Sequence, residues 1–198
     1  MEESDGRIRL SQGYTKMPRF LVLLRGVNVG KGNRVPMAEF GALLEGLGYT
    51  SVKTLLNSGN AVFSSRGGRP PQHAAQIAKA LGERLGVSVP TIVKSAREIA
   101  AIVEGNPIPP PDGGHSQYLV AFGPDAGAIE GLTALRPLIG EAERFAITSE
   151  AAYLDCAGSL LGSQAATALL GRLGRGVTTR NWATVLKLAA LLDEKEIL

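Results

Sequence analysis

A glycine-rich, positively charged stretch offers the clearest chemistry in this 198-residue sequence. Residues 25–34 read Arg-Gly-Val-Asn-Val-Gly-Lys-Gly-Asn-Arg and lead toward a helical pattern that starts near Pro36. Glycines let backbone N–H groups approach a ligand, while basic side chains and a helix N-terminus favour negative charge. We therefore expect an anion site here, formed by Arg25, Gly26, Asn28, Gly30, Lys31, Gly32, Asn33 and Arg34.

The glycine spacing of this stretch matches neither common phosphate-binding motif. The glycines follow G-x-x-x-G-x-G, which is not the dinucleotide pattern G-x-G-x-x-G, and no G-x-x-x-x-G-K-[ST] phosphate loop is found. A long turn whose glycines meet backbone demands explains the same residues without a ligand. The sequence leaves both interpretations open.

Two further polar clusters are candidates for ligand contacts. Asn57-Ser-Gly-Asn60 can orient a ligand through hydrogen bonds, but it is also a good hairpin turn because Asn and Gly tolerate positive φ. In Thr178-Thr-Arg-Asn-Trp182, the asparagine is expected to cap a helix and the tryptophan to anchor it in the core. Arg180 has no evident structural role, which makes it the stronger functional candidate. The candidate ligand residues of the two clusters are Asn57, Ser58, Asn60, Thr179, Arg180 and Asn181.

Side chains for acid–base, nucleophilic or metal chemistry are sparse. The acids fall mainly on predicted helices and indicate a solvated face, and no G-x-S-x-G motif is found. His73 and His115, the only histidines, lack ligand spacing and are expected to be exposed. Cys156 lies in an apolar strand and is expected to be inert. The sequence therefore assigns no catalytic residue and no metal ligand, and it neither identifies a cofactor nor decides whether the protein is an enzyme.

Composition indicates a soluble protein of the cytoplasm. Apolar residues make up 44% of the chain, enough for a core, yet no apolar run is long enough to cross a membrane. The first sixteen residues lack the apolar centre of a signal peptide, and a single cysteine allows no internal disulfide. The net charge of +3 is a mild lean toward anionic partners.

The apolar patterns predict an α+β fold with two similar halves. Each half reads β-α-β-β-α-β with a trailing helix, which is the ferredoxin-like order. The organisation is a disordered lead-in over 1–17, a first half over 18–106, a proline- and glycine-rich linker over 107–114 and a second half over 115–198. Strands are expected at 20–24, 52–56, 61–65, 89–94, 118–122, 144–148, 152–156 and 176–179, and the main helices at 36–48, 72–85, 95–103, 129–139, 163–173 and 182–192.

This order of elements brings two of the polar clusters together. A helical crossover makes the first two strands parallel, so their C-terminal ends lie at one edge of the sheet. The 25–34 stretch leaves the first strand there, and the 57–60 turn leaves the second strand there. Whether the 178–182 cluster joins them depends on how the halves pack, which the sequence does not fix.

Four segments together resemble a bacterial family known as domain of unknown function 1697. The resemblance rests on Leu23-Leu-Arg-Gly-Val-Asn-Val-Gly30, Arg34-Val-Pro-Met37, Asn57-Ser-Gly-Asn60, and Thr178-Thr-Arg-Asn-Trp182 followed by Leu186-Lys-Leu188, and it spans about Arg19 to Leu192. It implies a tandem ferredoxin-like fold and a bacterial origin, but no established activity. Two positions depart from the family's pattern, because Leu161-Gly-Ser-Gln164 and Ala183 stand where the family tends to have Gly-Arg-Ser-Lys and Asn.

Three functional hypotheses follow from these residues. The leading one is a protein that binds a phosphate-bearing small molecule or nucleotide at the polar loop edge. The second is an enzyme that stabilises a phosphoryl group electrostatically and uses Mg²⁺. The third is a module that interacts with a protein or a nucleic acid, although no run resembles the aromatic motifs with which open sheets stack RNA bases. No membrane partner is expected.

Overall fold

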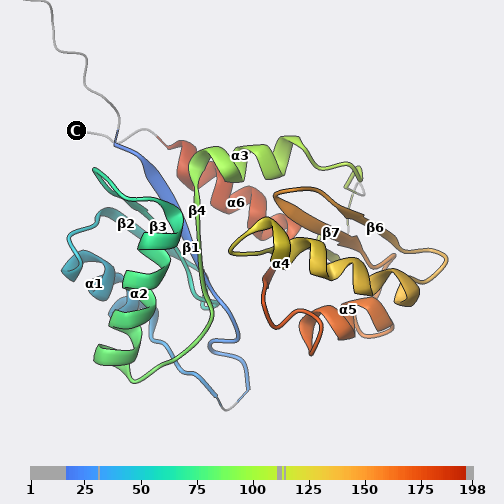
Figure 1. Ribbon diagram of the computed structural model, residues 1–198, viewed down its shortest axis with the longest axis horizontal. Coiled ribbons are helices and arrows are strands. Elements are labelled where there is room, and N and C mark those ends of the chain that lie inside the picture. The colour runs from blue at the N-terminus through green and yellow to red at the C-terminus, as the bar shows by residue number, and fades with distance from the viewer. Residues whose placement is uncertain (1–16, 31, 111–112, 114, 195–198) are drawn as a thin grey trace, which may run out of the picture.

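The computed structural model describes residues 17–30, 32–110, 113 and 115–194. The predicted lead-in falls outside these residues except for Met17, as do positions 111, 112 and 114 of the predicted linker. The order β-α-β-β-α-β plus a helix occurs twice, with one four-stranded antiparallel sheet in each half (Figure 1). The predicted pair of ferredoxin-like halves with trailing helices is therefore confirmed. None of the described helices combines the length and apolar character needed to cross a membrane.

The first half forms a sheet with strand order β2-β3-β1-β4. Its central strand, β1, consists of six buried residues and is antiparallel to both β3 and β4. Because β2 is antiparallel to β3, β1 and β2 run in the same direction, as predicted. The elements are β1 (Arg19–Leu24), α1 (Met37–Gly46), β2 (Thr50–Leu55), β3 (Asn60–Ser64), α2 (Pro70–Leu85), β4 (Thr91–Ser95) and α3 (Ala96–Glu104).

The second half repeats this topology with strand order β6-β7-β5-β8. The buried strand β5 takes the place of β1 and pairs with β7 and β8. The elements are β5 (Tyr118–Phe122), α4 (Ala126–Glu130), the 3₁₀ helix η1 (Gly131–Leu138), β6 (Arg144–Ile147), β7 (Ala151–Asp155), α5 (Gln164–Leu170), β8 (Thr178–Asn181) and α6 (Trp182–Asp193).

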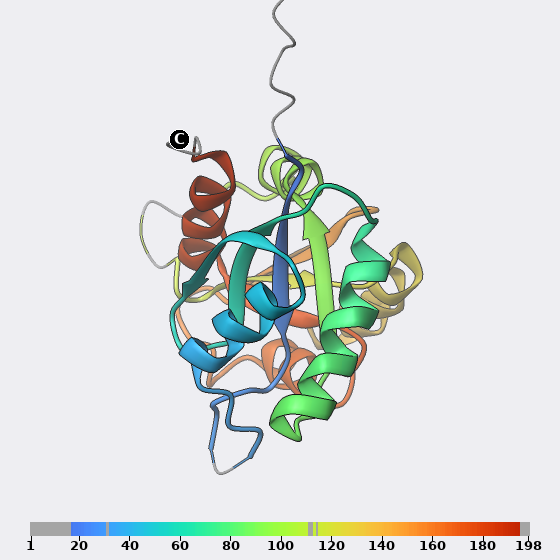
Figure 2. The ribbon, with the colours of Figure 1, turned by 90° about the vertical axis from the view of Figure 1, so that its left-hand side faces the viewer.

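Three apolar clusters form the core, one within each half and one between the two sheets. Alternate side chains of β1 pack against α1 and α2, which lie in front of the first sheet in Figure 2. The second sheet packs in the same way against α4, η1 and α5. Between the sheets, α3 and α6 fill a shared cluster that includes Leu21, Val120 and Trp182. Both faces of the first sheet are therefore covered, so neither is open for stacking RNA bases.

Two predicted elements of the second half need correction. The helix predicted over 129–139 is α4 followed by the 3₁₀ helix η1, a segment that starts at Gly131 and contains Pro137. Proline has no N–H to donate and glycine is a weak helix former, so a regular α-helix does not continue there. The strand predicted over 176–179 lies two residues further on, as β8.

His73 was predicted to be exposed, and that prediction is wrong. Its side chain is buried in the first half, where the ring contacts those of Phe20, Tyr49 and Phe63. Gly68 has a φ of +95°, and a Cβ there would lie 2.6 Å from the imidazole. Only glycine combines that backbone conformation with enough space for the ring.

Candidate anion-binding site

The loops that follow β1 and β2 meet at one edge of the first sheet, as the parallel direction of these strands predicted. The Nδ2 atom of Asn28 donates hydrogen bonds to the backbone carbonyl of Asn57 at 3.0 Å and to its Oδ1 at 3.1 Å. Asn28 has a φ of +57°, which asparagine tolerates better than most residues, and its Oδ1 accepts from the N–H of Val35 at 2.9 Å. Asn28 therefore fixes the two loops against each other.

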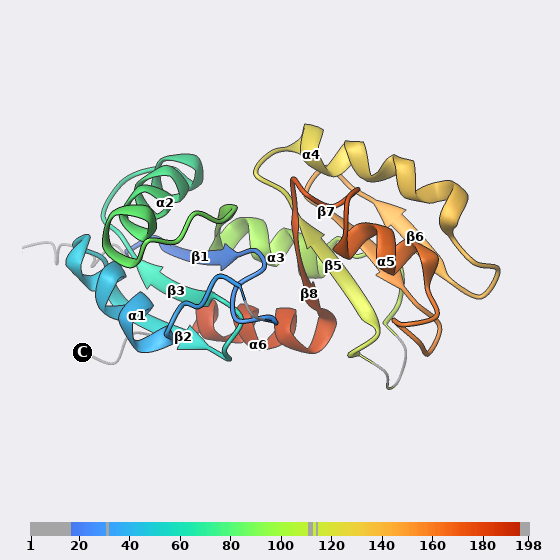
Figure 3. The same cartoon turned by 90° about the horizontal axis from the view of Figure 1, so that it is seen from below.

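Arg180 brings the third polar cluster to the same place. Its guanidinium reaches out of β8 into the first half and donates from Nε to Asn60 Oδ1 at 2.5 Å. Its Nη2 atom donates to the carbonyls of Leu24 at 2.8 Å and Ser58 at 3.0 Å. We call the contact of residues 24–29 and 57–60 with residues 170–180 the seam. Figure 3 shows the loop after β1 beside β8 at this position.

The prediction that Arg180 has no structural role is wrong. Its Nη1 atom donates to Thr178 Oγ1 at 2.8 Å and to the carbonyl of Thr179 at 2.7 Å, so all five N–H groups have partners. The residue is only 9% exposed, and burial lowers the pKa of Arg180 to about 10. All five acceptors are neutral, so the hydrogen bonds are satisfied, while no carboxylate among the described residues forms an ion pair with this charge.

Arg25 crosses the seam in the opposite direction. It donates from Nη1 to the carbonyls of Gly174 and Val177, and from Nη2 to those of Leu170 and Gly171 at 3.1 and 3.2 Å. These carbonyls belong to the end of α5 and the loop after it, where a helix terminus favours a cation. The two arginines thus hold the halves together reciprocally, each binding backbone carbonyls of the other half.

A cavity of about 340 Å³ lies between these two arginines. Arg25 and Arg180 both belong to its lining, which includes no acidic residue among the residues that the structure describes, and Ser58 and Thr179 add hydroxyl groups to it. Ser58 Oγ accepts a hydrogen bond from Asn60 at 2.9 Å, which leaves its own proton available to donate. The full lining is Leu24, Arg25, Gly26, Val27, Val29, Ser58, Leu170, Thr178, Thr179 and Arg180.

The first half contains a buried cation that is equivalent to Arg180 but is neutralised. Lys94 lies one residue before the N-cap of α3, just as Arg180 lies one residue before the N-cap of α6, and each pairs with the central strand of its sheet. Glu98, four residues after Lys94, approaches its Nζ to 3.4 Å. The residue four positions after Arg180 is Thr184, so the second half lacks the matching acid.

The other predicted ligand residues that the structure describes are buried, cap a helix, bond within their own loop or are exposed away from the cavity. Asn60 is fully buried, and the side chain of Asn181 caps α6 through the N–H of Thr184 at 2.9 Å, as predicted. Asn33 Nδ2 donates to the carbonyl of Gly26 at 3.4 Å. Gly30, Gly32 and Arg34 are exposed and do not line the cavity, and Lys31 lies outside the described residues.

The apolar part of this site was not predicted from the sequence. Val27, Val29 and Leu170 line the cavity, and Val29 is 64% exposed. Val27 and Val29 alternate with the polar residues of the loop, so the pattern offered a weak signal. Leu170 lies far away in the sequence and only the packing of the halves brings it here.

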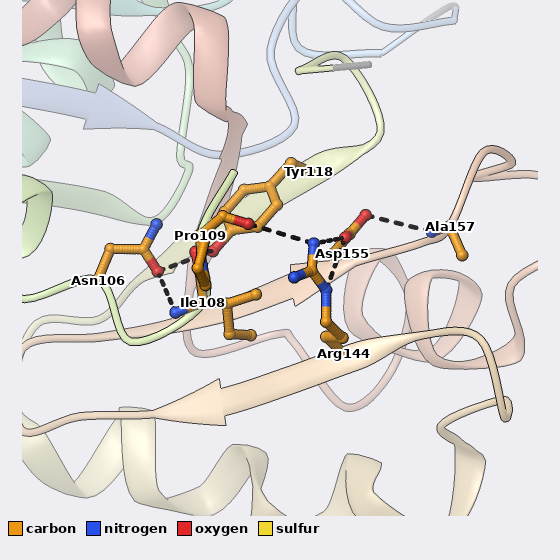
Figure 4. A network of polar contacts seen from close by, with 7 residues as sticks. All are labelled: Asn106, Ile108, Pro109, Tyr118, Arg144, Asp155 and Ala157. Carbon is orange, nitrogen blue, oxygen red and sulfur yellow. Dashed lines mark hydrogen bonds and ion pairs between the residues drawn. The ribbon is translucent and has the colours of Figure 1, made fainter. Parts of the chain in front are cut away.

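A second arginine network shows what a neutralised guanidinium looks like in this protein (Figure 4). Arg144 donates to Asp155 Oδ2 from Nη2 at 2.6 Å and from Nε at 3.1 Å, and from Nη2 to the carbonyl of Pro109 at 3.2 Å. Tyr118 donates to the carbonyl of Ile108 at 3.0 Å. These bonds tie the segment that connects the halves to the second sheet. Because Asp155 neutralises Arg144, this guanidinium needs no external anion as a partner.

Comparison with known proteins places the chain in a family. Residues 17–153 match the family described as "Protein of unknown function (DUF1697)", so the chain belongs to this family. The matched range contains the loops after β1 and β2 but ends before β8. A solved structure of a conserved bacterial protein from Streptococcus pneumoniae aligns with a TM-score of 0.67 and 24% identity, over 89% of this chain and 99% of the other. This likeness supports the fold alone. No curated protein matches.

Proposed function

We propose that the protein binds a phosphate-bearing small molecule or nucleotide in the seam cavity. The observation that carries the proposal is the pair of arginines, Arg25 and Arg180, which line one cavity with no acidic residue among the described residues of its lining. A bound anion would neutralise the buried charge of Arg180 in the way that Glu98 neutralises Lys94.

An anion in the cavity would meet hydroxyl groups and one side of the Arg25 side chain. The five N–H groups of Arg180 already have partners, so it would act through its charge. Ser58 and Thr179, one from each half, belong to the lining and carry hydroxyl groups, which are hydrogen-bond donors. An anion there would therefore touch both halves, and its binding would stabilise their contact.

Binding, and not turnover, is the function that this lining supports. Among the residues that line the cavity there is no carboxylate, the usual protein anchor for Mg²⁺, and no histidine that could act as a base. The apolar side chains of Val27, Val29 and Leu170 fit the non-phosphate part of a ligand, since small-molecule sites combine apolar walls with few polar groups.

A thermal-unfolding screen tests this proposal with inorganic phosphate, nucleotides and phosphorylated metabolites at constant ionic strength. A ligand at a hundred times its Kd should stabilise the fold by about 2.7 kcal/mol. For a chain of this size, that raises Tm by roughly 5–10 °C.

Val29→Glu tests the place of binding without touching either arginine. Val29 is exposed at the cavity, so the new carboxylate should repel the anion and abolish the Tm shift while the fold persists. Leu161→Glu adds the same charge at a position that is 99% exposed and lies outside the cavity lining, and it should keep the shift. Equal shifts in both variants would place the binding elsewhere, and no shift with any compound would contradict the proposal.

A further inference from the structure

The segments that form the seam come from parts of the chain without any acidic residue. Residues 19–38, 46–82 and 156–192 contain no Asp or Glu, and each of these stretches contains four Lys or Arg. The acids lie mainly over 83–155. No carboxylate from these stretches can therefore offset the positive field around the cavity.

Positive charge continues from the cavity onto the loop after α5. Arg172 and Arg175 lie in the segment whose carbonyls accept from Arg25, and both are exposed. Neither forms an ion pair within the part of the chain that the structure describes. We call these two residues the rim arginines.

The rim is close enough to the cavity for the charges to interact. The pKa of Arg25 is lowered first by its burial and then by repulsion from Arg175. An anionic group between Arg25 and Arg175 would attract both cations and so offset their mutual repulsion. Cations thus lie at three depths: Arg180 is buried, Arg25 is half-buried and the rim arginines are exposed.

We infer that the seam binds an oligophosphate, meaning a ligand with at least two linked phosphate groups, of which one occupies the cavity and the next meets the rim arginines. This inference rests on the proposed function, since it assumes the cavity phosphate. The geometry favours a chain of charges over a single one because the cations form a series from inside to outside. Nucleoside polyphosphates and inorganic oligophosphates share this chemistry.

Titration calorimetry of the full chain with AMP, ADP, ATP and tripolyphosphate tests the inference. We expect the affinity to rise from AMP to ADP to ATP. The Arg172→Gln/Arg175→Gln variant should lose this rise, with a roughly 2- to 25-fold loss for ATP since each exposed pair contributes little, while AMP binding stays unchanged. Arg97→Gln, which removes an exposed cation from α3, is the matched control and should bind every ligand like the wild type.

The outcomes separate the inference from the proposed function. If AMP binds as tightly as ATP, or if the rim variant weakens both equally, the oligophosphate inference is wrong while the cavity site stands. If no ligand binds, both fail. Tripolyphosphate binding as tightly as ATP identifies an inorganic oligophosphate, and tighter ATP binding identifies a nucleotide. A single-stranded oligonucleotide that binds more tightly than any of them, with a steep salt dependence, would overturn the inference in favour of a nucleic acid.

Discussion

Replacing Arg180 with methionine should destabilise the protein strongly, because this residue links the halves. The substitution keeps a long, largely apolar side chain but removes five hydrogen bonds of 2.5–3.0 Å. Among the abandoned acceptors, Asn60 Oδ1 belongs to a fully buried residue, while the buried carbonyl of Leu24 keeps only a long hydrogen bond of 3.4 Å from Thr178 Oγ1. Each buried acceptor left without a partner costs about 1–3 kcal/mol.

The net effect is smaller than the sum of these costs because the buried charge disappears as well. Burial disfavours the charged guanidinium, as its lowered pKa shows, and removing it relieves that penalty. We expect a loss of about 3 kcal/mol in the free energy of unfolding. That corresponds to a fall in Tm of roughly 6–12 °C for a chain of this size.

Urea denaturation followed by circular dichroism measures this change. The midpoint should fall while the slope m stays constant, since the surface exposed on unfolding is the same. Arg175→Met removes an exposed arginine of the adjacent loop and should change stability by less than about 0.5 kcal/mol. If Arg180→Met were as stable as Arg175→Met, the reasoning about the seam would be refuted.

Three further changes test other parts of the structure. Burial lowers the pKa of His73, so the unfolded chain binds a proton at a higher pH than the folded protein does. The free energy of unfolding should therefore fall as the pH drops below about 6.5, by up to about 1.4 kcal/mol per pH unit. His73→Gln should remove this pH dependence in denaturation curves. Thr184→Glu places an acid where the first half has one, which should neutralise Arg180 and weaken anion binding at least roughly tenfold in calorimetry, whereas Thr184→Gln should not. Tyr118→Phe removes a hydroxyl whose single proton is shared between Asn106 Oδ1 and the carbonyl of Ile108 in the connection between the halves, and it should cost about 1–3 kcal/mol of unfolding free energy in denaturation curves.

Local patterns in the sequence predicted most of the fold. The strand predicted at 20–24 is confirmed by β1, which is buried along its whole length. The helix predicted at 95–103 is confirmed by α3, where the side chains of Ser95 and Glu98 exchange hydrogen bonds with the backbone of the first turn. These features depend on neighbours within four residues, so short-range pattern contains the information. The 3₁₀ segment over 131–138 was missed because its apolar spacing also suits an α-helix.

The candidate site was predicted in part. Strand direction alone was enough to predict that the loops after β1 and β2 meet, because it follows from the helical crossover between them. The role of Arg180 was not predictable, since its partners Leu24, Ser58 and Asn60 lie at least 120 residues away in the sequence. The position of Arg180, one residue before the N-cap of α6, does not predict this role from the sequence. Its significance follows only from the structure, in which the equivalent Lys94 pairs with Glu98.

The burial of His73 was also not predictable, because it depends on residues that are distant in the sequence. A histidine in the first turn of an amphipathic helix is usually solvated, and its sequence neighbours give no reason to expect otherwise. Its ring is buried because Gly68 leaves room for it and because three aromatic rings from other elements surround it. Such an environment exists only after the sheet and α2 have packed.

A crystal structure of the protein soaked with tungstate tests the anion site most directly, because the anomalous signal of tungsten locates the oxyanion. We predict a strong peak in the seam cavity, within hydrogen-bonding distance of a hydroxyl of Ser58 or Thr179 and beside the guanidinium of Arg25. Crystals of Val29→Glu should lack this peak. A cavity without tungstate in the wild-type crystals, or the same peak in both proteins, would contradict the account.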